Sequence, residues 1–233
     1  MTQLIRTAMI LAAGLGERLK PLTDHTPKPL MSAGGLTLLD WHMLRLQALN
    51  IDRVVINISH LAEQIETHLK TKWANAPFDI IVSREPTPLE TAGGIANARP
   101  WLGDAPFLIL NGDVWTNADL NLALNRRWPQ HSFAHLFLVP NPRHHPEGDF
   151  FLDQDGRVSC APPGLRITYA GLGVFSPALF DPLDANAGRL GPFLRKWAME
   201  GRVTGSLLDG CWFDVGTPKR LRQWQRFMEE ASA

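Results

Sequence analysis

Short apolar runs alternate with amphipathic segments along the first part of the chain. Each apolar run is strand-sized, and several are apolar on both faces. Between them, residues 38–49 and 61–69 carry their apolar side chains at helical spacing. Strands buried on both faces that alternate with helices predict an α/β fold, a Rossmann-like, mostly parallel sheet with helices on both faces. The predicted strands are residues 8–13, 53–58, 78–83, 106–110 and 134–139.

The pattern changes after residue 140, where turn-forming residues become frequent. Asp155-Gly156 lies between two short strand-like runs and predicts a hairpin. Residues 166–175 predict another strand, followed by helices at about 177–183 and 191–200. We therefore expect a small antiparallel subregion within a single domain that covers residues 1–233.

The tail, residues 218–230, predicts a helix that docks on the body of the protein. Its apolar side chains fall on one helical face. These side chains are Leu221, Trp224, Phe227 and Met228.

Composition narrows the classes of partner. Lysine plus arginine and aspartate plus glutamate both number 23, so no net field favours nucleic acid or an anionic membrane. Cys160 and Cys211 lack disulfide or metal-ligand spacing, which is typical of a reducing compartment. No apolar stretch approaches the roughly 20 residues that span a bilayer. We expect a cytoplasmic protein without nucleic-acid or membrane partners, and the pattern leaves its oligomeric state open.

The stretch LAAGLGERLKPLTDHTPKPL, residues 11–30, follows the first predicted strand, where open α/β sheets bind ligands. A dinucleotide-binding fingerprint needs a third glycine, but Leu19 stands there, and the second strand ends in INISH without an acid. No glycine precedes Lys-Ser or Lys-Thr, so a P-loop is also excluded. Both common nucleotide motifs are therefore absent.

A glycine turn with cations remains, and it suits a phosphate ligand. Gly14 and Gly16 allow backbone N–H groups to approach a phosphate chain, and Arg18 and Lys28 add positive charge. Pro29 biases Lys28 towards an extended backbone. The alternative is an ordinary turn whose charged side chains face water.

Two aspartates stand near predicted ligand-binding edges. Asp113 ends the stretch FLILNGD. The Asn-Gly pair before it is a hairpin signal. Because the stretch begins as an apolar strand, however, Asp113 is expected on the ligand-binding rim of the sheet. Asp214, in CWFDVGTP, precedes the tail helix and could simply cap it.

The complete loop resembles the signature of the sugar-1-phosphate nucleotidyltransferases. That signature runs Leu-Ala-Ala-Gly-x-Gly-x-Arg, then Pro-Leu-Thr, then Pro-Lys-Pro-Leu, and every part of it is present. The resemblance implies a GT-A-like fold, catalytic roles for Arg18, Lys28 and Asp113, and Mg²⁺ held by Asp113 and Asp214. It implies a nucleotide site formed by Leu11, Ala12, Ala13, Gly14, Gly16, Arg18, Thr91, Ala92, Gly93 and Asn111.

The segment NPRHHPEGDF, residues 141–150, is similar to bacterial N-acetylmuramic acid 1-phosphate uridylyltransferases of peptidoglycan recycling, as are PLETAGG, NGDVWT and FSPALF. This implies transfer of a uridylyl group from UTP to that sugar phosphate, with pyrophosphate as the second product. Residues 1–140 would then bind nucleotide and 141–215 sugar. The implied sugar-binding residues are Arg143, His145, Gly148, Asp149, Tyr169 and Gly171; Arg143, His144 and His145 are candidates for the lactyl carboxylate.

Three other functions stay open. Mannose-1-phosphate guanylyltransferases and glucose-1-phosphate thymidylyl- or uridylyltransferases share the loop signature, and backbone groups that select a base cannot be read from sequence. A non-catalytic subunit that binds nucleotide sugar would be expected to lose its charged site residues. Arg18, Lys28, Asp113 and Asp214 are all present.

Overall fold

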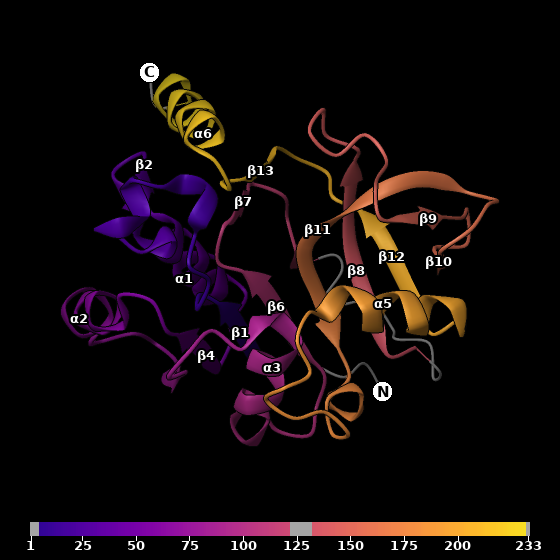
Figure 1. Ribbon diagram of the computed structural model, residues 1–233, viewed down its shortest axis with the longest axis horizontal. Coiled ribbons are helices and arrows are strands. Elements are labelled where there is room, and N and C mark those ends of the chain that lie inside the picture. Colours follow the sequence, from indigo (N-terminus) through magenta and orange to yellow (C-terminus); the bar gives the residue numbers. More distant parts are fainter. Residues whose placement is uncertain (1–4, 122–131, 232–233) are drawn as a thin grey trace.

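The computed structural model describes residues 5–121 and 132–231 (Figure 1). A nine-stranded sheet forms its centre, and one half of this sheet is parallel, in the order β5-β4-β1-β6. These four strands confirm the first four strands predicted from the apolar runs. They are β1 (Thr7–Leu11), β4 (Arg53–Ile58), β5 (Asp79–Arg84) and β6 (Phe107–Asn111).

The long strand β11 (Leu165–Phe175) joins the parallel half to the rest of the sheet. It runs antiparallel to β6 and also to β8 (Ala134–Pro140), which is in turn parallel to β12 (Val203–Leu207). The predicted hairpin is confirmed as β9 (Phe150–Leu152) and β10 (Val158–Ser159), which pairs through β9 with β11.

Helices cover both faces of the sheet, as predicted. Alternate residues of β1 point to opposite faces, so Ala8 and Ile10 belong to one apolar cluster and Met9 to the other. The first cluster includes α1 (Leu38–Ala48) and α2 (Ala62–Lys72). The second includes α3 (Glu90–Leu102) and α5 (Leu190–Met199).

The C-terminal helix α6 (Pro218–Glu230) packs against the segment that leads from the loop after β1 to α1. Leu221 and Trp224 of α6 share a third apolar cluster with Leu19, Met31 and Trp115. Figure 1 shows α6 beside β2, far from α5. This contact is how the end of the chain is brought close to the loop that follows β1.

Short elements fill the region between α6 and the sheet. They are the 3-10 turns Glu17–Leu19, Leu22–Asp24 and Lys28–Leu30, the hairpin of β2 (Ser32–Ala33) and β3 (Leu36–Thr37), and the pair of β7 (Val114–Thr116) and β13 (Trp212–Asp214). The sequence pattern predicted none of these strands, because each is only two or three residues long.

Two local predictions are wrong. The helix expected at 177–183 is only a 3-10 turn, Pro177–Leu179, because Pro182 disfavours helical dihedrals at Asp181. Lys28 begins a 3-10 turn instead of lying extended; Pro27 holds the extended backbone, and the Leu30 N–H donates to the Pro27 carbonyl at 2.8 Å.

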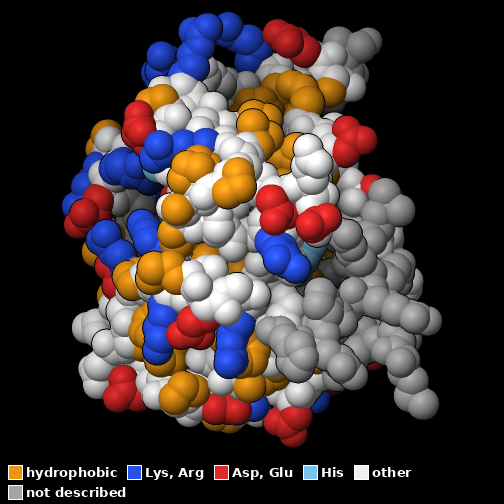
Figure 2. All heavy atoms as spheres, turned by 90° about the vertical axis from the view of Figure 1, so that its right-hand side faces the viewer, with side chains coloured by type: hydrophobic (Ala, Val, Ile, Leu, Met, Phe, Trp, Pro, Cys, Tyr) orange, Lys and Arg blue, Asp and Glu red, His pale blue; other side chains and the backbone are white. Residues whose placement is uncertain are grey.

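On the face that carries α5, basic and acidic side chains are interspersed among apolar ones (Figure 2). Among the helices of residues 5–121 and 132–231, none combines the length and the apolar character of a membrane span. The proposed division into nucleotide-binding and sugar-binding parts stays a prediction.

Candidate active site

The loop after β1 owes its shape to two glycines that act differently. Gly16 has a φ of +66°, and a Cβ there would lie 2.7 Å from Cγ2 of Thr23, whose hydroxyl donates to the Gly16 carbonyl at 3.0 Å. A Cβ on Gly14 would meet nothing within 4 Å. Gly16 therefore sets the turn, whereas Gly14 leaves the space beside the loop open.

A buried polar network fixes the same loop to the neighbouring strand ends. The Asn57 side chain accepts from the Ala12 N–H at 2.9 Å and donates to Glu85 at 2.7 Å, and Glu85 also accepts from the Leu89 N–H at 2.9 Å. Burial raises the pKa of Glu85, although the hydrogen bonds from Asn57 and from the Leu89 N–H oppose the shift. The strand ends and the loop before α3 are thus held together.

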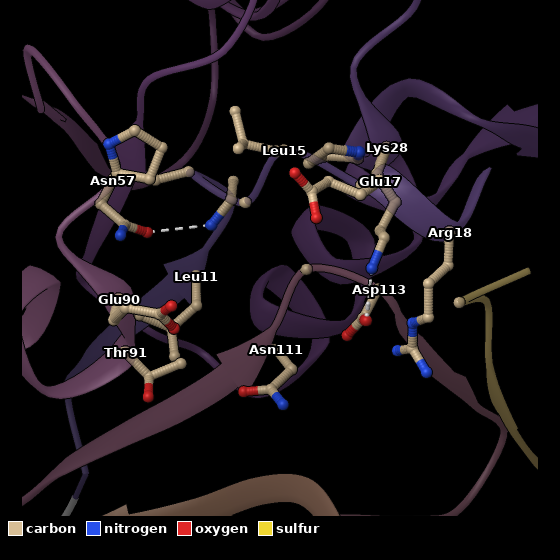
Figure 3. A pocket seen from close by; sticks show the side chains of 18 of the residues that line it. Leu11, Leu15, Glu17, Arg18, Lys28, Asn57, Glu90, Thr91, Asn111 and Asp113 are labelled. Atoms are coloured by element: carbon tan, nitrogen blue, oxygen red, sulfur yellow. Dashed lines mark hydrogen bonds and ion pairs between the residues drawn. The ribbon is translucent and has the colours of Figure 1, made fainter. Parts of the chain in front are cut away.

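These segments enclose a cavity of about 600 Å³ (Figure 3). Most of the predicted nucleotide-binding residues line it: Leu11, Ala12, Ala13, Gly14, Gly16, Arg18, Thr91 and Asn111. Lys28 and Asp113 line it as well. In the close-up, Lys28 and Arg18 lie at one side of the cavity, and Glu90 and Thr91 lie at the other. The cavity therefore has a cationic end, formed by Lys28 and Arg18, and an opposite end where Glu90 pairs with Arg189.

Ala92 and Gly93 do not line the cavity, although the resemblance assigns them to the nucleotide. Their N–H groups donate to the Gly188 carbonyl at 2.7 and 3.2 Å. Thr91 is not the helix cap but the second residue of α3, and its hydroxyl accepts from the Leu190 N–H at 2.7 Å. The start of α3 is thus anchored to the segment before α5.

Asp113 and Asp214 are brought together by the backbone. The Val215 N–H donates to the Asp113 carbonyl at 2.7 Å, and β13 pairs with β7 so that Asp214 lies opposite Val114. Gly112 fits against the Leu11 carbonyl, 2.6 Å from where its Cβ would stand. Asp214 does not cap α6, because Thr217 does so through its hydroxyl.

Each of the two carboxylates faces a cation of the protein. Lys28 Nζ lies 2.7 Å from Asp113 Oδ2. Burial alone would raise the pKa of Asp113, but the Lys28 ammonium, a backbone hydrogen bond and the Arg18 charge together outweigh it, so the pKa lies below its ordinary value. This carboxylate is therefore ionised at neutral pH.

Asp214 has a different environment. Its Oδ2 lies 3.3 Å from His144 Nε2 and 3.3 Å from Arg220 Nη2. Burial raises the pKa of Asp214; Arg220 and His144 oppose the shift, whereas the Asp113 carboxylate adds to it. The two aspartates are thus close enough to repel each other. A cation bound between them would remove this repulsion.

A second cavity, of about 280 Å³, opens beside the first. The two share three lining residues, Arg18, Asn111 and Asp113. The rest of the second cavity is lined by Val114, His144, His145, Thr168, Tyr169, Ala170, Gly171, Trp212 and Asp214. Asp113 therefore stands where two neighbouring ligand spaces meet.

Of the predicted sugar-binding residues, His145, Tyr169 and Gly171 line this second cavity, and Arg143, Gly148 and Asp149 do not. Asp149 instead holds the wall in place, since it lies 3.1 Å from His145 Nε2 and accepts from the Tyr169 N–H at 2.9 Å. Gly148, at φ +58°, packs against the Ile167 carbonyl, and Arg143 is exposed. The sugar roles of all six remain predictions.

Gly171 occupies an irregular point of β11, where the pairing with β8 shifts register between Tyr169 and Gly173. Its φ is +77°, and a Cβ would lie 2.8 Å from Asn111 Nδ2. Glycine is needed here so that β11 can approach the end of β6. Tyr169, at the start of the same irregularity, lines the cavity, and its hydroxyl is buried without a hydrogen-bond partner in the described residues.

Several residues that line the first cavity were not predicted from the sequence. They are Leu15, Glu17, Pro29, Pro88, Glu90, Gly112, Arg189 and Gly216 in the first cavity, together with Asn57. A polar residue inside the apolar run RVVINI was a usable signal for Asn57. Arg220 reaches Asp214 from a helix that was interpreted only as a docking element.

The donor set suits a hard divalent cation. Asp113 and Asp214 offer two carboxylates, and Mg²⁺ binds through one or two carboxylates with substrate phosphates and water. Within residues 5–121 and 132–231, no group of three or more ligating side chains occurs, so phosphate and water oxygens would have to complete the coordination.

Comparison with known proteins gives the family. A family model described as nucleotidyl transferase matches residues 7–159, more than half of the chain. The chain belongs to the nucleotidyl transferase family. The α/β fold with its two adjoining cavities is thus that of a nucleotidyltransferase enzyme, as the loop signature implied.

Relatives and a solved structure agree with this nucleotidyltransferase assignment. An N-acetylmuramate alpha-1-phosphate uridylyltransferase of Neisseria meningitidis is 44% identical, covering 94% of this chain and 96% of that one. A protein of the same name from Caulobacter vibrioides is 33% identical, covering 94% and 95%. A Bacillus anthracis structure assigned as a glucose-1-phosphate thymidylyltransferase shares the fold, with a TM-score of 0.82 at 16% identity, covering 96% and 95%.

Proposed function

We propose that this nucleotidyltransferase joins UTP to N-acetylmuramic acid 1-phosphate and releases UDP-N-acetylmuramic acid and pyrophosphate. The two full-length relatives of that name support the choice of substrates. The observation that carries the reaction type is the junction of the two cavities at Arg18, Asn111 and Asp113. A nucleotide in the larger cavity and a sugar phosphate in the smaller one would place their phosphates at this junction.

The chemistry needs positioning more than a covalent intermediate. A sugar phosphate oxygen attacks the α-phosphorus of UTP, the new P–O bond forms, and the bond to the bridging oxygen of pyrophosphate breaks. The attacking phosphate is already an anion at neutral pH, so no general base is required. Arg18 and Lys28 at the cationic end stabilise the negative charge that builds up on the transferred group.

Asp113 and Asp214 would hold Mg²⁺, which neutralises phosphate charge when bound. Lys28 can then turn from Asp113 to phosphate, because a compact ammonium on a flexible stem is easily redirected. The Asp113 carboxylate is ionised at neutral pH, as a ligand must be.

In the second cavity, His145 and Tyr169 would contact the sugar. His145 lies beside Asp149, and the Tyr169 hydroxyl is a buried donor whose partner a sugar oxygen would supply. His144 lines the same cavity and is a candidate for the lactyl carboxylate. In a cell, the product would serve peptidoglycan recycling in the cytoplasm.

The proposed reaction is tested by identifying its phosphorus-containing products. Purified protein is mixed with UTP, Mg²⁺ and N-acetylmuramic acid 1-phosphate, and ³¹P NMR records the products. We expect equal amounts of a nucleotide diphosphate sugar and pyrophosphate, and neither product after chelation of Mg²⁺. Release of inorganic phosphate without a nucleotide sugar would contradict the proposal.

A further inference from the structure

Glu90 adopts a backbone conformation that is uncommon for its residue type. Its φ is +61°, in the left-handed region that glycine occupies without strain. A non-glycine residue there costs free energy, and such strain persists only where the surroundings impose it. Glycine at this position would adopt the same backbone at lower cost.

The residues on both sides of Glu90 hold it in this left-handed backbone conformation. On one side, the buried Glu85 carboxylate accepts from the Leu89 N–H at 2.9 Å. On the other side, the Gly188 carbonyl accepts from the Ala92 N–H at 2.7 Å, and a Cβ on Gly93 would lie 2.5 Å from the Ala185 carbonyl oxygen. The chain on both sides of Glu90 is thus fixed, so the strain cannot relax.

The contacts of the Glu90 side chain within the protein do not offset this strain. Its carboxylate lies 3.5 Å from Arg189 Nε, and the two side chains are 53% and 78% exposed. An exposed ion pair contributes about 0–1 kcal/mol. The stabilising partner of the Glu90 side chain is therefore to be sought outside the protein.

The position of Glu90 narrows the kind of partner. Glu90 and Arg189 both line the larger cavity, and Glu90 lies across it from Lys28 and Arg18 (Figure 3). A carboxylate is repelled by phosphates and accepts hydrogen bonds from neutral donors. In a uridine nucleotide, the donors outside the phosphates are the ribose hydroxyls and one N–H of the base. A half-exposed group at the rim suits the hydroxyls, and carboxylates bind ribose hydroxyls in other nucleotide sites.

We propose that Glu90, paired with Arg189 in the larger cavity, accepts hydrogen bonds from the ribose hydroxyls of the bound nucleotide and thereby selects ribonucleotides over 2′-deoxyribonucleotides. The inference deepens the proposed function and rests on it, because it takes a uridine nucleotide as the ligand of the larger cavity. Glu90 is then a specificity-determining residue whose backbone strain is retained for ligand recognition.

The test measures binding and stability together on the full chain. UTP and 2′-deoxyuridine triphosphate are titrated by calorimetry in the presence of Mg²⁺, without sugar phosphate, and thermal unfolding is followed in parallel. The variants are Glu90→Gly, which relieves the strain, and Glu90→Gln, which keeps it but removes the charge. Asn50→Gly is the matched control, since Asn50 has a φ of +52° and does not line the cavity.

We expect wild-type protein to prefer UTP by about 10- to 100-fold, the range of a charge-assisted hydrogen bond. Glu90→Gly should bind UTP about 10- to 100-fold more weakly and the deoxynucleotide unchanged, while its unfolding midpoint rises by about 2–4 °C. Glu90→Gln should lose affinity for UTP without that rise. Asn50→Gly should leave both affinities as they are.

Two results would overturn the role of Glu90 alone. One is Glu90→Gly protein that still prefers UTP, and the other is an equal loss for both nucleotides, which would assign Glu90 to the base. Wild-type protein that binds neither nucleotide, but binds a guanosine or thymidine nucleotide, would overturn the proposed function and this inference together.

Discussion

The ammonium nitrogen of Lys28 lies 2.7 Å from Oδ2 of Asp113, a residue 85 positions away in the chain. The pair stands where the two cavities meet, with the Lys28 and Asp113 side chains only 17% and 27% exposed. Lys28 comes from the loop after β1, and Asp113 follows β6, the strand next to β1. The neighbouring ends of two parallel strands thus create both a cation for phosphate and a carboxylate for metal.

Asp113→Asn should lower kcat about 100-fold or more, because the neutral amide is a poor metal ligand and leaves the phosphate charge less well neutralised. Circular dichroism should show an unchanged fold. The matched control is Asp79→Asn, an exposed aspartate of β5 far along the sheet. Turnover by Asp113→Asn protein at the rate of the control would remove Asp113 from the site.

Gly171→Ala should destabilise the protein by about 1–3 kcal/mol and lower kcat, since the new methyl group would push Asn111 out of place. Gly35→Ala separates the two causes. Gly35 has a φ of +76°, close to the +77° of Gly171, but its Cβ would meet nothing within 4 Å. Urea unfolding should show a smaller loss for Gly35→Ala. Equal losses would mean that close approach to Asn111 is irrelevant.

Arg220→Ala should move the acid limb of the activity profile to higher pH. Burial raises the pKa of Asp214, and Arg220 is the main group that opposes this shift. Without Arg220 the pKa of Asp214 rises further, so a higher pH is needed to ionise the carboxylate. The measurement is kcat/KM against pH. Arg222→Ala, an exposed arginine of the same helix, should leave the profile unchanged. An unshifted limb in Arg220→Ala would contradict the coupling.

Asp40→Asn should lower the free energy of unfolding by about 3 kcal/mol, because Asp40 is fully buried and joins α1 to α2. Its carboxylate accepts from Lys72, Trp73 and His68, each at 2.8 Å. The comparison is Asp24→Asn, which breaks the exposed 3.8 Å pair with Lys20 and should cost less than about 0.5 kcal/mol. Urea unfolding of the two variants gives the difference, and equal costs would contradict it.

The Asp40 carboxylate should also make the free energy of unfolding fall in acid. Burial alone would raise the pKa of Asp40, but Lys72 and the other donors outweigh it and hold the pKa well below its ordinary value. A lowered folded-state pKa stabilises the fold above the unfolded value of about 4, and this contribution is lost as pH falls further. Unfolding measured from pH 6 down to pH 2 should show this contribution starting to fall below about pH 4 in wild type, and no such loss in Asp40→Asn. Parallel curves would contradict it.

The sequence allowed the parallel half of the sheet and its helices to be predicted, because apolar periodicity is a local property. It did not predict β7 and β13, since each is three residues long and its partner lies about a hundred positions away. The loop signature led to Arg18 and Lys28, and the end of an apolar strand led to Asp113. Arg220 was missed because the apolar face of its helix indicates only where the helix packs. It does not indicate that Arg220, in the first turn, contacts Asp214.

Glu90 was missed for a related reason. Positive φ at a glutamate cannot be read from residue type, because it arises from hydrogen bonds made by Glu85 and Gly188 around it. The sugar role of Gly148 stays a prediction, and the structure adds that its left-handed backbone packs against Asn141 and Ile167. Residue type indicated a constrained position in this case, but not which neighbour imposes the constraint.

The central claim is most directly tested by kcat/KM for pyrophosphate release from UTP with three sugars. These are N-acetylmuramic acid 1-phosphate, N-acetylglucosamine 1-phosphate and glucose 1-phosphate, each with Mg²⁺. The account predicts a preference for the muramic substrate of about 10- to 100-fold, the size of one charge-assisted contact to its lactyl carboxylate. Equal rates with the three sugars, or a preference for either of the other two, would contradict it.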